Sequence, residues 1–228
     1  MNPLVVIVIA AMIIGIVYLS HLLMQNTGGR DRSLQKLADF LEGKLEPLEG
    51  FDNSYKIEFE HKGKSFVYED VEDKGFSDVS HYRAFLKHKT STPFVLSFTE
   101  KSRTQMRANI KSLQDVVRNP WGSKANDLAT PKGLEEFTIF TNQIPQANEL
   151  FANEQIVDIF VRYKNIDARG YPVMSLEIPD GTAVLRFHGE GELKPNLFDL
   201  RSNVASIEHH LDNMVVIIDK VESFINNR

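Results

Sequence analysis

The sequence contains no cysteine among its 228 residues. This absence excludes disulfide bonds, thiol chemistry and cysteine-ligated zinc sites, and it fits a reducing compartment without establishing one. Several enzyme signatures are also missing: there is no Gly-x-Ser-x-Gly elbow, no phosphate-binding glycine-rich loop and no His-Glu-x-x-His motif. We therefore expect no metal and no cofactor. The motifs do not decide whether the protein is an enzyme, although their absence favours a protein without catalytic activity.

Charge is missing from one long segment, residues 3–24, which hold no Asp, Glu, Lys or Arg. A helix of this length covers the roughly 30 Å of bilayer hydrocarbon. A cleaved signal peptide would need basic residues before a shorter apolar run and small residues after it, whereas residues 18–23 are bulky and nothing basic precedes the run. The segment predicts an uncleaved transmembrane helix at 1–24, followed by a polar tether at 25–32.

Basic residues near the segment predict its orientation. Arg30, Arg32 and Lys36 follow it closely, and only Met1 and Asn2 precede it. Because cytoplasmic flanks carry the excess of Lys and Arg, we expect a single-pass protein of an inner or plasma membrane, with its N-terminus outside and its folded domain in the cytoplasm. Ala11 and Gly15 form a small-xxx-small pair that would let two such helices pack closely, although small residues are common in membrane spans.

The remainder of the chain predicts an α+β fold of antiparallel hairpins covered by helices. A loop at 119–133, with two prolines and two glycines, is the candidate boundary between a first α+β lobe at 33–118 and a second at 134–228. Alternation and helical spacing locate most elements of both lobes. They are a helix after Ser33, strands at 55–59, 66–68, 93–99, 136–141, 173–178 and 182–187, and helices at 101–117 and 145–164.

The last element is a long amphipathic helix. Its apolar residues recur at alternating spacings of four and three, which is heptad periodicity. They are Leu200, Val204, Ile207, Leu211, Met214, Ile218, Val221 and Ile225. Such a stripe either covers the sheet or pairs with a second copy in a coiled coil; we favour the first and keep a homodimer through the 200–225 helix open.

Positive charge is concentrated in the middle of the chain. Between Arg83 and Lys124 nine basic residues stand against two acidic ones, so this stretch carries +7 and the rest of the chain −12. Arg103, Arg107 and Lys111 are spaced by four and would form one stripe on the predicted helix. Near a membrane this stripe could dock on anionic lipid or on an acidic protein partner; a solvated, internally balanced face is the alternative.

Two further residues extend the candidate binding surface. Arg118 ends the basic helix, and Trp121, the only tryptophan, lies in the loop just after it. An exposed tryptophan there would serve as an interfacial or partner anchor, and a buried one would cover its own core. The aromatic residues among the basic ones are too dispersed to stack bases, so we expect no nucleic-acid binding.

Two functional hypotheses from different classes follow. The first is a membrane-anchored, non-enzymatic interaction or scaffold domain that binds anionic lipid or an acidic protein through the basic helix. The alternative is a membrane-tethered hydrolase or transferase whose site is built from non-motif residues at the lobe junction, near Trp121 and Asp127. A weaker third option is a subunit of a larger membrane complex, held by contacts of the anchor itself.

Overall fold

A computed structural model describes residues 30–74, 80–101, 123–124, 128–164, 176–189 and 200–226. In this part of the chain the fold is α+β, with helices packed on antiparallel sheets, which confirms the predicted class. No helix among these residues is long and apolar enough to cross a membrane. Residues 1–29, which hold the predicted anchor, lie outside the described part, so the anchor stays a prediction.

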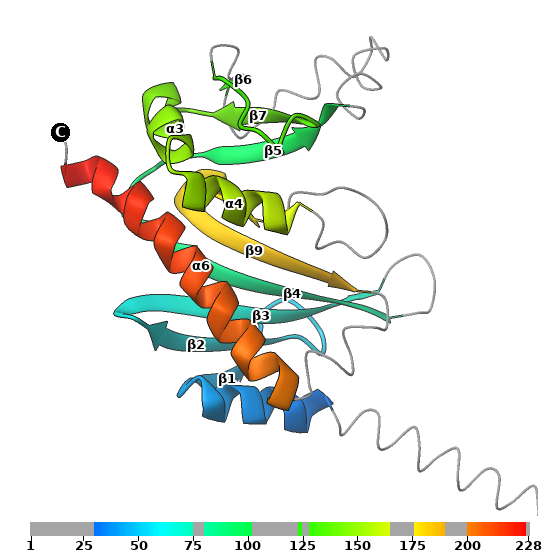
Figure 1. Ribbon diagram of the computed structural model, residues 1–228. Helices are drawn as coiled ribbons and strands as arrows, with labels where there is room; N and C mark the ends of the chain where they lie inside the picture. The colour runs from blue at the N-terminus through cyan, green and yellow to red at the C-terminus, as the bar shows by residue number, and fades with distance from the viewer. Residues whose placement is uncertain are drawn as a thin grey trace, which may run out of the picture.

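A six-stranded antiparallel sheet forms the larger layer (Figure 1). Its order is β1-β2-β3-β4-β9-β8, so the first four strands form a meander and β9 pairs with β4. The strands are β1 (Lys44–Pro47), β2 (Tyr55–His61), β3 (Lys64–Lys74), β4 (Ser80–Lys89), β9 (Thr182–Gly189) and β8 (Leu176–Glu177). This sheet therefore unites strands from both halves of the sequence, and the lobe boundary at 119–133 stays a prediction.

A second, three-stranded sheet adjoins the first. Its order is β5-β7-β6, with β5 at Leu96–Glu100, β7 at Phe137–Thr141 and β6 at Ser123–Lys124. The two sheets are joined where Leu96 and Ile178 exchange backbone hydrogen bonds of 2.9 and 2.8 Å. Their buried side chains belong to one hydrophobic core.

Both tight hairpins follow from local sequence. Lys62 and Gly63 connect β2 to β3 with φ of 50° and 73°, and Asp180 and Gly181 precede β9 with φ of 48° and 70°. Two consecutive positive φ angles match the right-handed twist of the flanking strands, and glycine adopts such angles without steric strain. The predicted hairpins at these two positions are therefore confirmed.

Three strands of the described chain were missed: β1, β4 and β6. The two residues of β6, Ser123 and Lys124, lie within the loop predicted at 119–133. Strand β4 carries many charges, yet Ala84, Leu86 and His88 alternate inward, while Arg83 and Lys87 belong to the opposite face. Three of the nine basic residues counted above (Arg83, Lys87 and Lys89) thus lie on this strand. The strand escaped prediction because its charges concealed the period-two pattern that identifies a half-buried strand.

The sequence also holds an acidic cluster of Glu69, Asp70, Glu72, Asp73 and Asp78, whose composition is typical of a solvated turn. Asp78 lies outside the described residues, and the other four lie on β3. Strand alternation directs Tyr68 and Asp70 to the core side, where they are 1% and 2% exposed. The interpretation as a turn was wrong, because cross-strand pairing with β2 and β4 overrides the low strand propensity of Asp and Glu.

The described helices lie where periodicity predicts them. A helix spans residues 30–40, so residues 30–32 of the predicted tether are helical. Its apolar face is buried as predicted, through Leu34, Leu37 and Ala38. The predicted 145–164 region divides into α3 (Ile144–Phe151) and α4 (Glu154–Tyr163). Asn153 separates them: its side chain accepts hydrogen bonds from the backbone N–H groups of Gln155 and Ile156, which caps α4.

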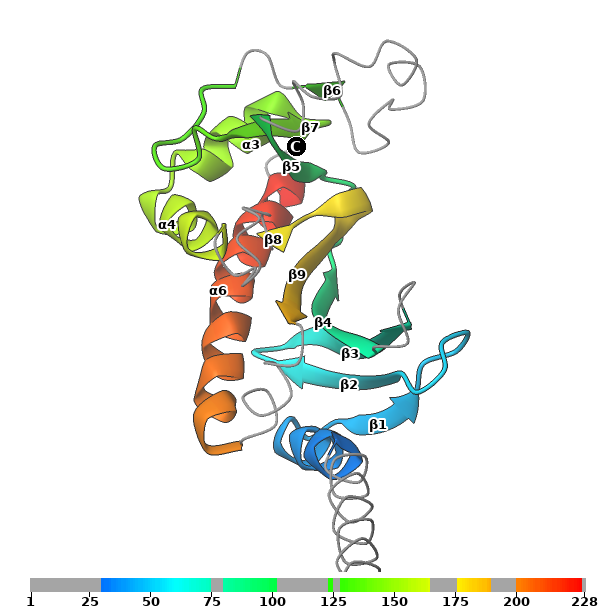
Figure 2. The same cartoon turned by 90° about the vertical axis from the view of Figure 1, so that its right-hand side faces the viewer.

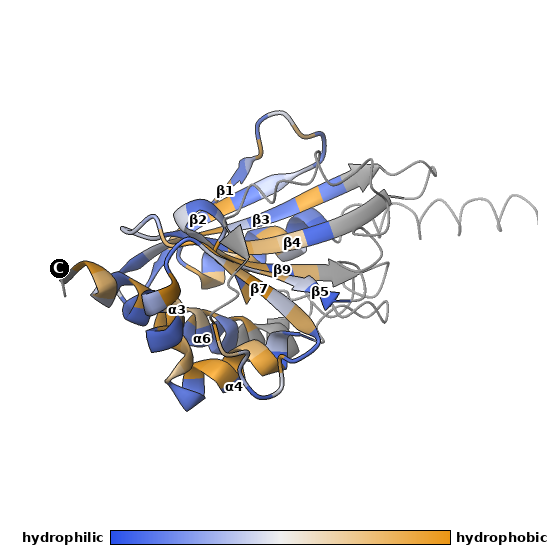
Figure 3. Cartoon of the chain, turned by 90° about the horizontal axis from the view of Figure 1, so that it is seen from above, coloured by the Kyte–Doolittle hydropathy of each residue, from blue (hydrophilic) through white to orange (hydrophobic). Residues whose placement is uncertain are grey.

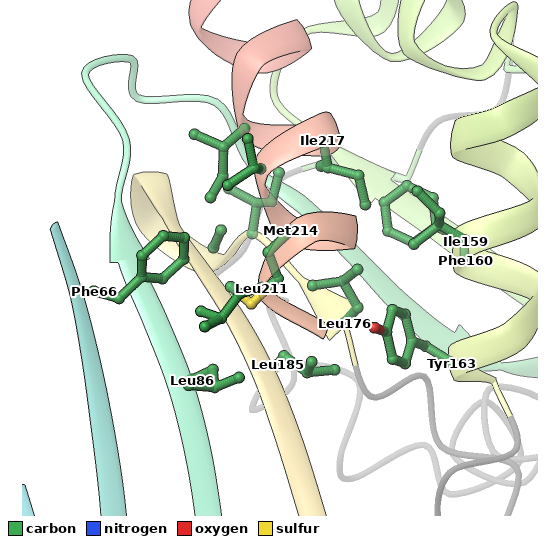
Figure 4. Packing of buried hydrophobic residues seen from close by; sticks show 14 of the residues in the cluster. Phe66, Leu86, Ile159, Phe160, Tyr163, Leu176, Leu185, Leu211, Met214 and Ile217 are labelled. Carbon is green, nitrogen blue, oxygen red and sulfur yellow. The ribbon is translucent and has the colours of Figure 1, made fainter. Parts of the chain in front are cut away.

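The C-terminal helix α6 (Leu200–Asn226) crosses one face of the large sheet (Figures 1 and 2). Figure 4 shows Leu211 and Met214 directed toward Leu86 and Leu185 of the sheet. Four residues of the predicted stripe, Leu211, Met214, Ile218 and Val221, have no exposed surface, and Ile207 is 2% exposed. The stripe thus covers the sheet, the interpretation favoured from the sequence.

Helix α6 also buries a second face that the heptad pattern did not indicate. Val215, Ile217 and Phe224 are each less than a tenth exposed, and Figure 4 shows Ile217 facing Ile159 and Phe160 of α4. The helix is therefore enclosed between the sheet and the α3–α4 pair. Dimerisation through this helix stays a prediction and would depend on surface outside the buried stripe, such as Ile225, which is 43% exposed.

Hydrophilic and hydrophobic residues alternate along strands of the large sheet (Figure 3). On the face opposite α6, Lys87 Nζ lies 2.6 Å from Glu69 Oε2 and 5.4 Å from the centre of the Phe85 ring. Arg186 and Glu177 pair at 3.4 Å on the same sheet. That face is thus covered by ion pairs between neighbouring strands.

The helix over 30–40 ends in a Schellman motif. Gly43 N–H donates to Ala38 O at 2.9 Å, and Glu42 N–H donates to Asp39 O at 3.4 Å. The left-handed residue is Glu42, with φ of 53°, and not the glycine. Gly43 instead lies against β2: a Cβ there would be 2.7 Å from both Glu58 O and Ile57 Cγ2.

This geometry predicts opposite effects for two adjacent substitutions. Gly43→Ala is expected to destabilise the fold by about 1–3 kcal/mol, because the added methyl overlaps β2. Glu42→Gly is expected to stabilise it by about 0.5–1 kcal/mol, because glycine adopts the left-handed conformation without strain. Urea denaturation followed by circular dichroism measures both. A Gly43→Ala variant as stable as the parent would show that this close approach is not required.

Candidate functional site

The residues predicted to bind lipid or a partner lie outside the described part of the chain. They are Arg103, Arg107, Lys111, Arg118 and Trp121. The same holds for Ala11 and Gly15 of the predicted anchor, and for Asp127 of the alternative enzymatic site. These assignments stay predictions. Among the described residues, three polar clusters and one groove are candidates for a functional site.

The first cluster, here called the Arg30 junction, comprises Arg30, Asn53, Tyr55 and Asp70. The Arg30 guanidinium forms a hydrogen-bonded ion pair with the Asp70 carboxylate, with side chains only 11% and 3% exposed. Arg30 Nη1 also donates to Asn53 O at 2.7 Å, and the guanidinium carbon lies 5.4 Å from the centre of the Tyr55 ring. The junction joins the first described helix to β3 and to the β1–β2 loop.

Burial governs the electrostatics of the Arg30 junction. It raises the pKa of Asp70 above its usual value, and the Arg30 charge opposes this shift. Burial, together with the negative charge of Asp70, also raises the pKa of the Tyr68 hydroxyl well above its usual value. The Arg30–Asp70 ion pair thus places two opposite charges in a desolvated site, where each charge is stabilised by the other.

The second cluster attaches α6 to the β2–β3 hairpin. Asp212 lies 2.7 Å from both His61 Nε2 and Lys62 Nζ, which lowers its pKa. About two to three turns further along the helix, Lys64 Nζ lies 2.8 Å from both Asp219 and Glu222. These pairs are partly exposed and contribute about 0.2–1 kcal/mol each, so they orient the helix more than they stabilise it.

The third cluster lies where α4 meets α6. Asn213 Nδ2 donates to the Tyr163 hydroxyl oxygen at 3.2 Å and to His209 Nε2 at 3.1 Å. The Tyr163 hydroxyl in turn donates to His210 Nδ1 at 2.8 Å, and the His210 ring lies 5.0 Å from that of Phe187. Because Asn213 already donates to the Tyr163 oxygen, we assign the hydroxyl proton to the bond with His210 Nδ1, which accepts it when the imidazole is neutral and carries its proton on Nε2.

The pKa values of Tyr163 and His210 keep both side chains neutral. Burial, together with the neighbouring His209, lowers the pKa of His210 to about 4. Burial raises the pKa of Tyr163 to about 12. A general acid or base is most effective with a pKa near the working pH, so this pair is set for hydrogen bonding and not for proton transfer at neutral pH.

A groove of about 550 Å³ lies beside the end of the first helix and the β2–β3 hairpin. Its apolar floor and acidic rim suit a cationic or amphiphilic molecule better than an anionic one. The lining includes Leu41, Phe59 and Phe66 together with Glu42, Glu58 and Glu60. Among the residues that the structure describes, no group of three or more His, Cys, Asp or Glu is arranged to hold a metal ion.

Sequence reasoning found none of these clusters. Their members are distant in sequence: Arg30 and Asp70 are 40 residues apart, and Tyr163 and His210 are 47 apart. One signal was available, because the alternation that buries Ile57 and Phe59 on β2 also directs Tyr68 and Asp70 inward on β3. An acidic residue at a core position requires a cationic partner.

Comparison with known proteins adds no assignment, since no family model, no curated protein and no solved structure matches the chain.

Proposed function

We propose that the protein is a single-pass membrane protein whose folded part is a non-enzymatic interaction domain on the cytoplasmic side. The observation that carries the proposal is the uncharged stretch at residues 3–24, long enough for one span. The Arg30 junction supports it, because the first described residue after that stretch is fastened to the sheet by a buried ion pair. A domain attached in this way is held close to the bilayer.

The binding surface that we propose is the basic stripe of Arg103, Arg107 and Lys111, with Arg118 and Trp121 beside it. Four or five basic residues near an anionic leaflet contribute roughly 1 kcal/mol each, which suffices for docking. An acidic protein partner would use the same charges.

Membrane integration is tested with the full chain in cells. We expect the protein to stay in the membrane pellet after washing at alkaline pH and to resist protease added outside intact cells. A matched variant with Ile9→Lys and Ile13→Lys should be found largely in the wash, since charges at the centre of a span oppose insertion, whereas Ile9→Leu with Ile13→Leu should behave as the parent. Release of the unmodified chain, or its cleavage from outside, would contradict the proposal.

The binding surface is tested by charge reversal. Arg103→Glu, Arg107→Glu and Lys111→Glu together are expected to weaken recovery of the domain on phosphatidylserine-containing vesicles at least tenfold, and to reduce the salt dependence of what remains. Reversal of Lys44, Lys56 and Lys62, which belong to the sheet and its hairpin, serves as a control of equal charge. Equal binding of parent and triple variant to anionic and neutral vesicles would remove lipid as the ligand.

A further inference from the structure

We propose that the helix over residues 30–40 lies on the membrane surface and binds anionic lipid headgroups through a stripe of Arg32, Lys36 and Phe40, here called the outer stripe. This inference rests on the proposed anchor and adds a second contact with the bilayer, separate from the basic helix at 101–117. It is carried by four observations: the reach of the chain, the fixation of Arg30, the two faces of the helix and its position in the fold.

The reach of the chain is short. Five residues, 25–29, separate the end of the apolar stretch from Arg30. Fully extended, they span at most about 18 Å, and any bend shortens this distance. With an inserted anchor, the start of the helix is therefore confined to the neighbourhood of the headgroups.

Arg30 transmits this confinement to the domain. Its ion pair with Asp70 and its 2.7 Å hydrogen bond to Asn53 O fix the first residue of the helix to β3 and to the β1–β2 loop. The helix is further held by Leu34, Leu37 and Ala38, all less than a tenth exposed. It cannot separate from the sheet without exposing these side chains, so the helix and the sheet are confined together.

The exposed surface of the helix consists of two stripes of different charge. Arg32, Lys36 and Phe40 recur every four residues on one side, and all three are exposed, Phe40 by 36%. Asp31 and Asp39 belong to the neighbouring stripe, in which Gln35 donates to Asp39 at 2.9 Å. The negative charge of Asp31 contributes to the raised pKa of Tyr55 on β2, which places Asp31 on the side toward the sheet.

The position of the helix leaves the outer stripe accessible. Figures 1 and 2 both show the helix at the lower end of the fold, with the C-terminal end of α6 at the opposite end. A basic and aromatic stripe on an amphipathic helix is typical of an interfacial segment, where each basic residue strengthens attachment to an anionic leaflet about fivefold and an aromatic ring enters the headgroup layer. Lipid is thus the occupant that this surface fits.

Tryptophan fluorescence tests the contact in the full chain reconstituted into vesicles. A Phe40→Trp reporter in a Trp121→Phe background is expected to be quenched by lipids that carry a quencher just below the headgroup, and more strongly when phosphatidylserine is present. An Ile225→Trp reporter in the same background is the control, because residue 225 is 43% exposed at the far end of α6. Quenching at position 40 no greater than at position 225 would overturn the inference.

Charge reversal identifies the stripe. Arg32→Glu with Lys36→Glu should reduce the phosphatidylserine-dependent quenching at position 40 at least fivefold, whereas Asp31→Lys with Asp39→Lys should preserve or increase it. An equal response of the two pairs would contradict the role of the outer stripe. Alkaline washing of the same vesicles separates the two proposals: release of the protein contradicts the anchor, and retention of an unquenched reporter contradicts only the stripe.

Discussion

Replacing Asp70 with alanine is expected to destabilise the folded domain by about 3–5 kcal/mol. The substitution leaves the Arg30 guanidinium, whose side chain is 11% exposed, without the carboxylate that balances its charge. Removal of one partner of a buried ion pair is among the most destabilising changes in a protein, because the remaining charge stays desolvated without its counter-ion. Urea denaturation of the full chain in mild detergent, followed by circular dichroism, measures the loss.

Two controls separate charge from packing. The double substitution Arg30→Met with Asp70→Ala removes both charges and should recover most of the lost stability, because an apolar pair avoids the desolvation of two ions. Glu69→Ala changes the adjacent residue on the opposite face of β3, whose partner Lys87 is 34% exposed, and should cost less than about 1 kcal/mol. If Asp70→Ala and Glu69→Ala had the same effect, the Arg30 junction would not be a structural determinant.

The Asp70 substitution also bears on the further inference. Loss of the ion pair frees the first residue of the helix from β3, although the outer stripe itself is unchanged. We therefore expect the Phe40→Trp reporter to become less quenched in an Asp70→Ala background than in the parent, even while the anchor stays in the membrane. The junction would then be the element that sets the orientation of the domain on the bilayer.

The second large effect is a dependence of stability on pH that arises at His210. Its pKa is about 4 in the folded state, against about 6.5 in an unfolded chain. Between these values the unfolded state binds more protons, so stability rises with pH through this window and falls as the solution is acidified from 6.5 toward 4. The full difference corresponds to about 3 kcal/mol, and below pH 4 this contribution does not decrease further.

Protonation of His210 changes its hydrogen bond with Tyr163. In the imidazolium form Nδ1 becomes a donor, so the Tyr163 hydroxyl can no longer donate to it and must rotate to accept from it. His210→Gln removes the titration, and the difference between parent and variant should vary by about 3 kcal/mol from pH 6.5 to pH 4 and be constant above pH 7.5. A difference that is independent of pH would show that His210 does not titrate in this window.

The test compares the parent with the His210→Gln variant because other groups titrate close to the same pH range. The pKa of Asp212 is lowered by Lys62 and His61, and its contribution is lost only below its usual value of 3.8. The raised pKa of Asp70 acts in the opposite direction, since the folded state binds its proton more readily. When the stability of the His210→Gln variant is subtracted from that of the parent at each pH, the change that remains between pH 4 and pH 6.5 is due to His210.

Much of this architecture was determined by the sequence at short range. The hairpins at Lys62-Gly63 and Asp180-Gly181, the buried face of the first helix and the stripe of α6 all follow from patterns among residues that are close together in the sequence. They are predictable because backbone geometry fixes the periods of 2 and 3.6, and because only certain residues tolerate positive φ. Strand β4 escaped prediction because its polar and charged residues together outnumber the four apolar ones and hide the period of two.

The tertiary structure alone decided which polar residues meet. The partners Arg30 and Asp70, or Tyr163 and His210, are brought together by packing between elements distant in sequence, and no local pattern encodes their distance. The same packing enclosed α6 between the sheet and α4, so that Ile217 and Phe224 became core residues beside the predicted stripe. Local order depends on bonds and sterics along the chain, whereas the burial that shifts a pKa or isolates a charge depends on every element that surrounds it.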